Sequence, residues 1–178
     1  MRKPKEYAAR RPGDIVQVDT AHIQPCPGWN FKQFTARDAI TRWDVLEAHS
    51  RATADAAAGF LDTTLARMPF PVQAIQSDGD SEFLGEFEIA CQERGIHFFI
   101  PTGVCLPPRS PKLNGHAERA QRTHREGSYE VVNLPDSLNE VNKMLRAWED
   151  VYNCYRPHQA LGYLTPRAFY QLSSQAAV

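Results

Sequence analysis

The chain has 178 residues, the length of one domain or slightly more; 42% of them are hydrophobic and 23% are charged. This balance is ordinary for a globular protein and excludes disorder over most of the chain. No stretch approaches the roughly 20 apolar residues that a membrane helix requires, so a membrane-spanning protein is excluded. The net charge of −1 is uninformative by itself, and the 4 cysteines lack the spacing of a zinc site or a disulfide framework.

The first 50 residues are rich in β-forming side chains and predict three successive strands. We expect these strands over residues 14–21, 32–41 and 43–50. The prolines and glycine within residues 22–30 predict the turn between the first two strands. Because the connections are short, the three strands are expected to form an antiparallel meander.

The periodicity then changes to that of a helix. From Thr53, a suitable N-cap, apolar residues recur at intervals of three and four until Pro69. A strand over 72–78, a helix over 87–94 and a strand over 96–101 follow. The order βββαβαβ predicts an α/β fold built on a mixed sheet.

The second half of the chain is expected to be mostly helical. A proline-rich loop over 101–113 precedes a helix from Asn114 to about residue 131, and a capping box at Ser137 and Glu140 begins another helix. A short last helix starts after Thr165. The helix that follows Ser137 is expected to bury one stripe, formed by Leu138, Val141, Leu145, Trp148, Val151, Tyr152 and Tyr155.

Charge is concentrated in one stretch, residues 109–125, which surrounds a single acid, Glu118. Its basic side chains are Arg109, Lys112, Arg119, Arg122 and Arg125. Charge alone fits a solvated helix face as well as it fits a nucleic-acid contact.

Three acidic residues stand at informative positions. Asp19 lies near the end of the first expected strand, Asp78 ends the fourth, and Glu118 lies within the basic stretch. Taken singly, each also fits a structural role, as a capped strand end, a turn residue or a surface ion pair. Together, three carboxylates could hold the divalent ions that phosphoryl transfer uses, and the nearby cations could hold a nucleic-acid backbone.

Four segments, in this order, resemble the catalytic core of DDE transposases and retroviral-type integrases of the kind found in bacterial insertion sequences. They are PGDIVQVDT, QSDGDSEF, SPKLNGHAERAQRTHRE and YNCYRPHQALGYLTPRAF, and they extend from about Pro12 to Tyr170. The resemblance implies an RNase H-like fold with a five-stranded mixed sheet flanked by helices. We expect residues 1–12 to be a basic leader or residual linker. The catalytic core is expected over 13–178, with C-terminal helices from about residue 137.

The resemblance also implies a chemistry. Asp19, Asp78 and Glu118 would hold Mg²⁺ or Mn²⁺, two ions when DNA is bound, for 3′-end cleavage of DNA followed by strand transfer. The chain would be a polynucleotidyl transferase that works as a homodimer or higher oligomer, in the cytoplasm at the nucleoid and without contact to a membrane. The residues expected to contact DNA are Lys112, Asn114, Arg119, Arg122 and Arg125.

The sequence departs from the family pattern in three places. Asp80 puts an extra negative charge where the family usually has glycine nearby, and it would be strained if the turn required a positive φ there. Residues 102–108 resemble an insertion. Because an end-binding domain usually precedes the core in this family, we expect the chain to be a truncated product or an excised core. Two alternatives therefore stay open. One is an inactive DNA-binding or dimerisation remnant, and the other is an RNase H-like nuclease that cuts without joining.

Overall fold

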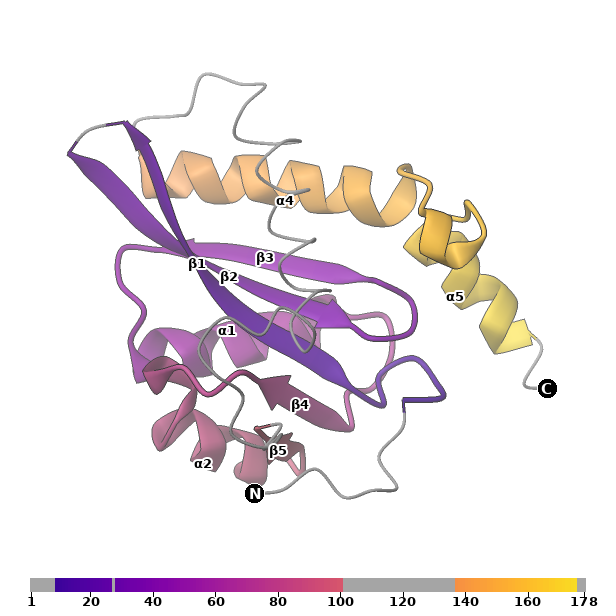
Figure 1. The fold of residues 1–178 in the computed structure, drawn as a ribbon, viewed down its shortest axis with the longest axis horizontal. Coiled ribbons are helices and arrows are strands. Elements are labelled where there is room, and N and C mark those ends of the chain that lie inside the picture. Colours follow the sequence, from indigo (N-terminus) through magenta and orange to yellow (C-terminus); the bar gives the residue numbers. More distant parts are fainter. Residues whose placement is uncertain (1–8, 27, 101–136, 176–178) are drawn as a thin grey trace, which may run out of the picture.

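A computed structural model describes residues 9–26, 28–100 and 137–175. Its strands are β1 (Val16–Cys26), β2 (Trp29–Asp38), β3 (Asp44–His49), β4 (Ala74–Ser77) and β5 (His97–Phe99). They form a sheet in the order β3-β2-β1-β4-β5 (Figure 1). The pairs β1–β2 and β2–β3 are antiparallel, whereas β1–β4 and β4–β5 are parallel. The expected mixed sheet that begins with an antiparallel meander is therefore present.

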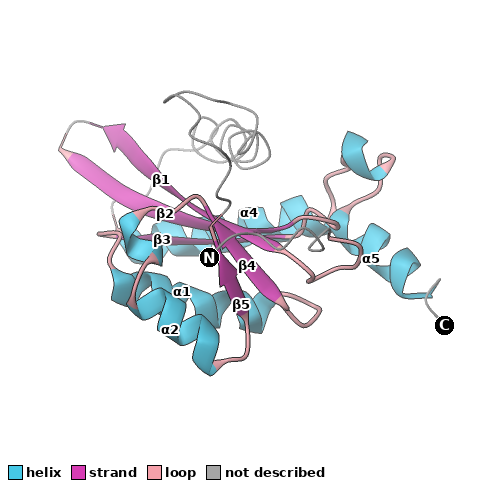
Figure 2. Cartoon of the chain, turned by 60° about the horizontal axis from the view of Figure 1, so that its bottom comes forward, coloured by secondary structure: helices cyan, strands magenta, loops and turns pink. Residues whose placement is uncertain are grey.

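Helices cover both faces of this sheet (Figures 1 and 2). They are α1 (Ala54–Arg67), the 3₁₀ turn η1 (Ser81–Phe83), α2 (Glu86–Glu93), α4 (Leu138–Cys154), the 3₁₀ turn η3 (Gln159–Leu161) and α5 (Pro166–Gln175). The helices α1 and α2 pack on one face, and α4 lies along β3 on the other. Within the described residues, no helix is long and apolar enough to cross a membrane.

The alternation of side chains along the strands divides the core into two main clusters. Val18 of β1 and Phe34 of β2 face α1 and α2, where they join Phe60 in the larger cluster. Ile23 and Phe31 face the opposite way and pack with Val141 and Leu145 of α4. The sheet is thus buried on both faces, and the side chains at its strand ends are held on a rigid frame.

The first hairpin is longer than the sequence indicated. The prediction of a turn over residues 22–30 is wrong, because β1 continues to Cys26 and β2 already begins at Trp29. Gly28, directly before β2, has a φ of +88°. The ladder is extended because Ile23 and Phe31, paired across it, both find apolar contacts beside α4. As a consequence Asp19 lies within β1 and not near the end of that strand.

The other end of β2 comes earlier than expected. The strand stops at Asp38, whose buried carboxylate accepts hydrogen bonds from the backbone N–H groups of Gly13 and Thr41 at 2.9 and 2.6 Å. The Thr41 hydroxyl donates to the same carboxylate at 2.8 Å. These bonds hold a turn where residues 39–41 were expected to continue the strand.

Most helix boundaries follow the sequence signals. Thr53, Ser137 and Thr165 each accept a hydrogen bond from the backbone N–H three residues later, as N-caps do. Gly95, with a φ of +68°, follows the C-cap of α2. The parallel strands β4 and β5 are shorter than expected, and each of their ladders pairs only three residues.

The buried side of α4 is more polar than its sequence suggested. Of the expected apolar stripe, Val151 is 43% exposed and Tyr155 is 76% exposed, so both assignments are wrong. Glu149 and Asn153 are buried in their place. Of the expected stripe residues after Trp148, only Tyr152 is therefore buried.

These polar side chains bind the free edge of β3. Asn153 accepts from the Asp44 N–H at 2.9 Å and donates to the Asp44 carbonyl at 2.8 Å. Asn142 makes the same pair of bonds with Ala48, at 2.7 and 2.9 Å, and Glu149 accepts from the Leu46 N–H at 3.1 Å. Because β3 is an edge strand, its outward backbone groups need partners, and α4 supplies them through side chains.

A second buried polar group joins the meander to the C-terminal segment. The Arg37 guanidinium binds both carboxylate oxygens of Asp44, at 2.7 and 2.5 Å, and donates to the Tyr152 hydroxyl at 2.5 Å. The His158 ring lies edge-on against Tyr152, with ring centroids 4.5 Å apart. Burial raises the pKa of Tyr152 and lowers that of His158, so both side chains are held neutral at pH 7.

Candidate active site

The parallel pairing of β1 with β4 sets Asp19 beside Asp78. Val18 is aligned with Ser77 in this ladder, so the next residue on each strand is an aspartate. Asp19 is buried, with 8% of its surface exposed, whereas Asp78 is exposed just beyond the end of β4. The sheet therefore presents one fixed carboxylate and one accessible carboxylate at the same place.

The turn after β4 aims a third carboxylate at this pair. Gly79 has a φ of +99°, and its N–H donates to the Ser77 hydroxyl at 3.1 Å. The Asp80 N–H donates back to the Asp78 carboxylate at 3.3 Å. Asp80 itself has a φ of −57°, so the strain considered for that position is absent, because Gly79 carries the positive φ.

Asp19, Asp78 and Asp80 can each offer one carboxylate oxygen, and these oxygens lie within 4.8 Å of one another. Burial raises the pKa of Asp80, the negative charges of Asp78 and Glu82 raise it further, and Lys32 opposes the shift. Three converging carboxylates repel one another, and a divalent cation would remove that repulsion. Oxygen ligands of this kind suit Mg²⁺ and Mn²⁺.

The structure thus brings together two of the three carboxylates expected from the sequence and adds Asp80, which the sequence presented only as a departure from the family pattern. The third expected carboxylate, Glu118, lies outside the described residues, as does the apparent insertion at 102–108. The same holds for every residue expected to contact DNA, namely Lys112, Asn114, Arg119, Arg122 and Arg125.

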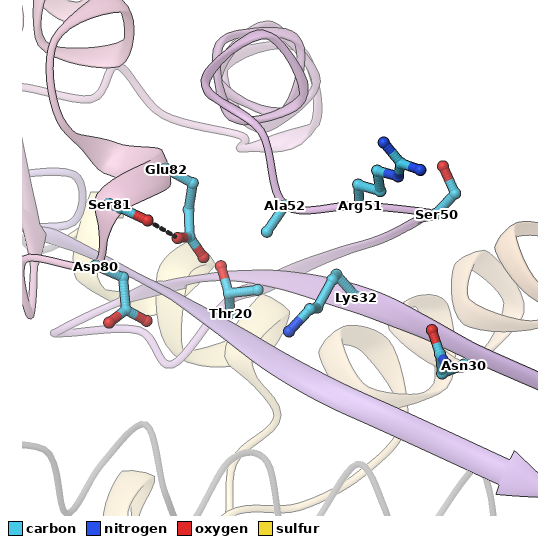
Figure 3. A pocket seen from close by; sticks show the side chains of 9 residues that line it. All are labelled: Thr20, Asn30, Lys32, Ser50, Arg51, Ala52, Asp80, Ser81 and Glu82. Carbon is cyan, nitrogen blue, oxygen red and sulfur yellow. Dashed lines mark hydrogen bonds between the residues drawn. The ribbon is translucent and has the colours of Figure 1, made fainter.

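A polar pocket of about 540 Å³ adjoins the carboxylates (Figure 3). It lies between the β1–β2 hairpin, the segment before α1 and the turn that contains η1. Its lining consists of Thr20, Asn30, Lys32, Ser50, Arg51, Ala52, Asp80, Ser81 and Glu82. This pocket could not be predicted from the sequence, because only the strand register shows that Thr20 and Lys32 share a face of the hairpin.

A mixed sheet in the order β3-β2-β1-β4-β5 with helices on both faces is the RNase H-like fold of integrase catalytic cores. Solved structures confirm this fold class. The catalytic core of BIV integrase superposes with a TM-score of 0.69 at 19% identity, over 92% of this chain and 97% of that one. The HTLV-2 integrase catalytic core, solved in complex with magnesium in a dimeric form, gives 0.68 at 14% identity, over 90% and 97%.

Sequence comparison indicates the same kind of protein. Residues 104–166 match the integrase core domain family. Transposase InsD of the insertion element IS2A/D/F/H/I/K from Escherichia coli is 38% identical over 61 residues, which are 34% of this chain and 20% of that protein. The match thus spans about a fifth of the length of this curated relative. Sequence and fold together confirm the resemblance to DDE transposase and integrase catalytic cores.

Proposed function

We propose that this chain is the catalytic core of a DNA transposase or integrase. Its reaction is 3′-end cleavage of DNA followed by strand transfer, two phosphoryl-transfer steps that depend on a divalent metal ion. The observation that carries the proposal is the convergence of Asp19 on β1 with Asp78, which directly follows the parallel strand β4, within a fold shared with retroviral integrase cores. The integrase core domain match over residues 104–166, which include Glu118, supports it independently.

In this proposal Asp19, Asp78 and Glu118 hold Mg²⁺ or Mn²⁺, two ions when DNA is bound. When bound, such ions would supply positive charge that stabilises the attacking and leaving oxygens of the phosphodiester. Asp19 contributes a carboxylate fixed by a buried strand, and Asp78 contributes one that the substrate can approach. Asp80 strengthens the negative potential that attracts the cation.

The wider proposal concerns the partners. DNA is the substrate, and Lys112, Asn114, Arg119, Arg122 and Arg125 are the proposed contacts from the basic stretch around Glu118. A homodimer or higher oligomer would process two DNA ends together, and the HTLV-2 core is a solved dimeric example of this fold. The place of action would be the nucleoid in the cytoplasm, where a bacterial transposase meets its DNA.

Strand cleavage and joining on a branched oligonucleotide test the proposal. Such a substrate mimics the joined product and needs little recognition of specific ends. Wild type is compared with Asp78→Asn and Glu118→Gln, in Mn²⁺ and in EDTA. Asp150→Asn, an exposed acid on α4, is the matched control.

We expect metal-dependent activity in wild type and Asp150→Asn. A loss of at least about 100-fold is expected in both site variants, because each removes a ligand of ions that contribute several kcal/mol to transition-state stabilisation. Full activity in either site variant would refute the ligand assignment. Free ends without joined products would support the nuclease alternative. An inactive, folded wild type that still binds DNA would support the remnant.

A further inference from the structure

The polar pocket beside the carboxylates has features of a ligand site in its own right. Every lining residue except Ala52 is polar or charged. Asp19 and Thr20 are successive residues of β1, so their side chains point to opposite faces of the strand. Asp80 belongs both to the carboxylate cluster and to the pocket lining. The pocket is therefore a neighbour of the proposed active site, joined to it through one shared side chain.

The charges in this pocket are separated. Figure 3 shows Asp80 and Glu82 on one side of the pocket and Arg51 on the other. The Lys32 ammonium group points toward the side of Asp80, and the Arg51 guanidinium points away from it. Among the described residues, no carboxylate lies within salt-bridge distance of Lys32 or Arg51, although Lys32 acts on Asp80 electrostatically. Two residues whose cations have no close ionic partner among the described residues thus line the same pocket.

The register of the sheet explains why both cations are available. Lys32 lies two residues before Phe34 on β2, and Phe34 packs against α1, so Lys32 is on the face of the hairpin that α1 covers farther along. Ser50 and Arg51 follow β3 and precede Thr53, the N-cap of α1. Because the helix begins only after this segment, the hairpin extends beyond the helical layer (Figure 2). The side chains of Asn30 and Lys32 on the hairpin line the pocket.

We propose that this pocket is a second DNA-contact site, in which Lys32 and Arg51 each bind a backbone phosphate of the strand that passes the carboxylates. A phosphodiester is the anion that two unpaired cations beside a polar pocket would recognise, and hydroxyl and amide groups such as those of Ser50 and Asn30 commonly bind its oxygens and the sugar. The identity of the ligand as DNA rests on the proposed function. The site itself rests on the geometry of the pocket.

Binding of a fluorescein-labelled branched oligonucleotide tests the site without requiring catalysis. Anisotropy titrations are made over a series of salt concentrations, in Ca²⁺ and in EDTA. The variants are Lys32→Gln and Arg51→Gln, which remove one charge each. Their matched controls are Lys143→Gln on α4 and Arg167→Gln on α5, both exposed. The helix α5 lies at the end of the molecule away from the hairpin (Figure 1).

We expect Lys32→Gln and Arg51→Gln each to weaken binding in Ca²⁺ about threefold to tenfold. Each should also reduce the slope of log K against log salt by about 1, as the loss of one phosphate contact does. Both controls should stay within twofold of wild type. Arg51 lies in an exposed segment outside any strand, so this variant tests the site even if Lys32→Gln disturbs β2.

The proposal is overturned if Arg51→Gln, or a folded Lys32→Gln, binds within twofold of wild type with an unchanged salt slope. It is also overturned if the controls lose as much affinity, or if the wild-type chain does not bind the oligonucleotide. The proposed function fails by a different result, namely wild-type protein that binds this DNA but neither cuts nor joins it in Mn²⁺. The two failures can therefore be told apart.

Discussion

Asn153 offers the sharpest test of how the C-terminal helix holds the sheet. Its side chain makes two hydrogen bonds to the backbone of Asp44, and Asn153 is only 2% exposed. In Asn153→Ala the N–H and carbonyl of a buried residue lose their partners. A buried group left unsatisfied costs about 1–3 kcal/mol, so we expect the free energy of unfolding to fall by roughly 3 kcal/mol.

Asn142→Ala is the matched comparison. It removes the same pair of bonds, to Ala48, but its bonds are only partly buried and water can replace them. We expect a loss of about 1 kcal/mol. Urea denaturation gives both values, and amide hydrogen exchange should show faster exchange at Asp44 in Asn153→Ala. Equal losses in the two variants, or a loss below about 1 kcal/mol in Asn153→Ala, would refute the argument that burial sets the cost.

Three further predictions concern charge and backbone. Burial raises the pKa of Glu149 to about 7, so its contribution to stability is present below its ordinary pKa of 4.5 and is lost as the pH rises through 7. The free energy of unfolding, measured by urea denaturation at each pH, should fall by up to about 3 kcal/mol over this window. In Glu149→Gln this dependence of stability on pH should disappear. Asp80→Asn removes a charge repelled by Asp78 and Glu82, so its melting temperature in EDTA should exceed that of wild type, and Mn²⁺ should raise it by less. Gly79→Ala should lower stability by about 1–2 kcal/mol in thermal unfolding, because alanine disfavours the φ of +99° and its Cβ would lie 3.3 Å from Ile100.

The sequence predicted those parts of the fold that depend on local signals. The caps at Thr53 and Ser137 and the glycine after α2 placed the helices correctly, because these signals act within a few residues. The first hairpin was wrong because residues 22–26 look like a turn locally. They are held in the strand by packing between Ile23, Phe31 and α4, which are distant in the sequence.

Some residues of the candidate site could likewise be predicted from local sequence signals, and others could not. Asp19 and Asp78 could be selected because a carboxylate in or next to an apolar strand is unusual. The position of Asp80 depends on which residue of the turn takes the positive φ. Lys32 and Arg51 come to line one pocket only once the strands are in register. The polar residues on the buried side of α4 could not be assigned either, since their partners are backbone groups of an edge strand.

The segment between Tyr152 and His158 lies in one of the four segments that carry the family resemblance, and the structure gives it a folding role. Asn153 binds β3, Tyr152 binds the Arg37–Asp44 pair, and His158 packs on Tyr152. None of these three belongs to the carboxylate cluster. Selection for a folded chain alone would therefore preserve this motif after the chemistry was lost. Searches of genomes with it should gather active elements and decayed copies alike, and only the carboxylates can separate them.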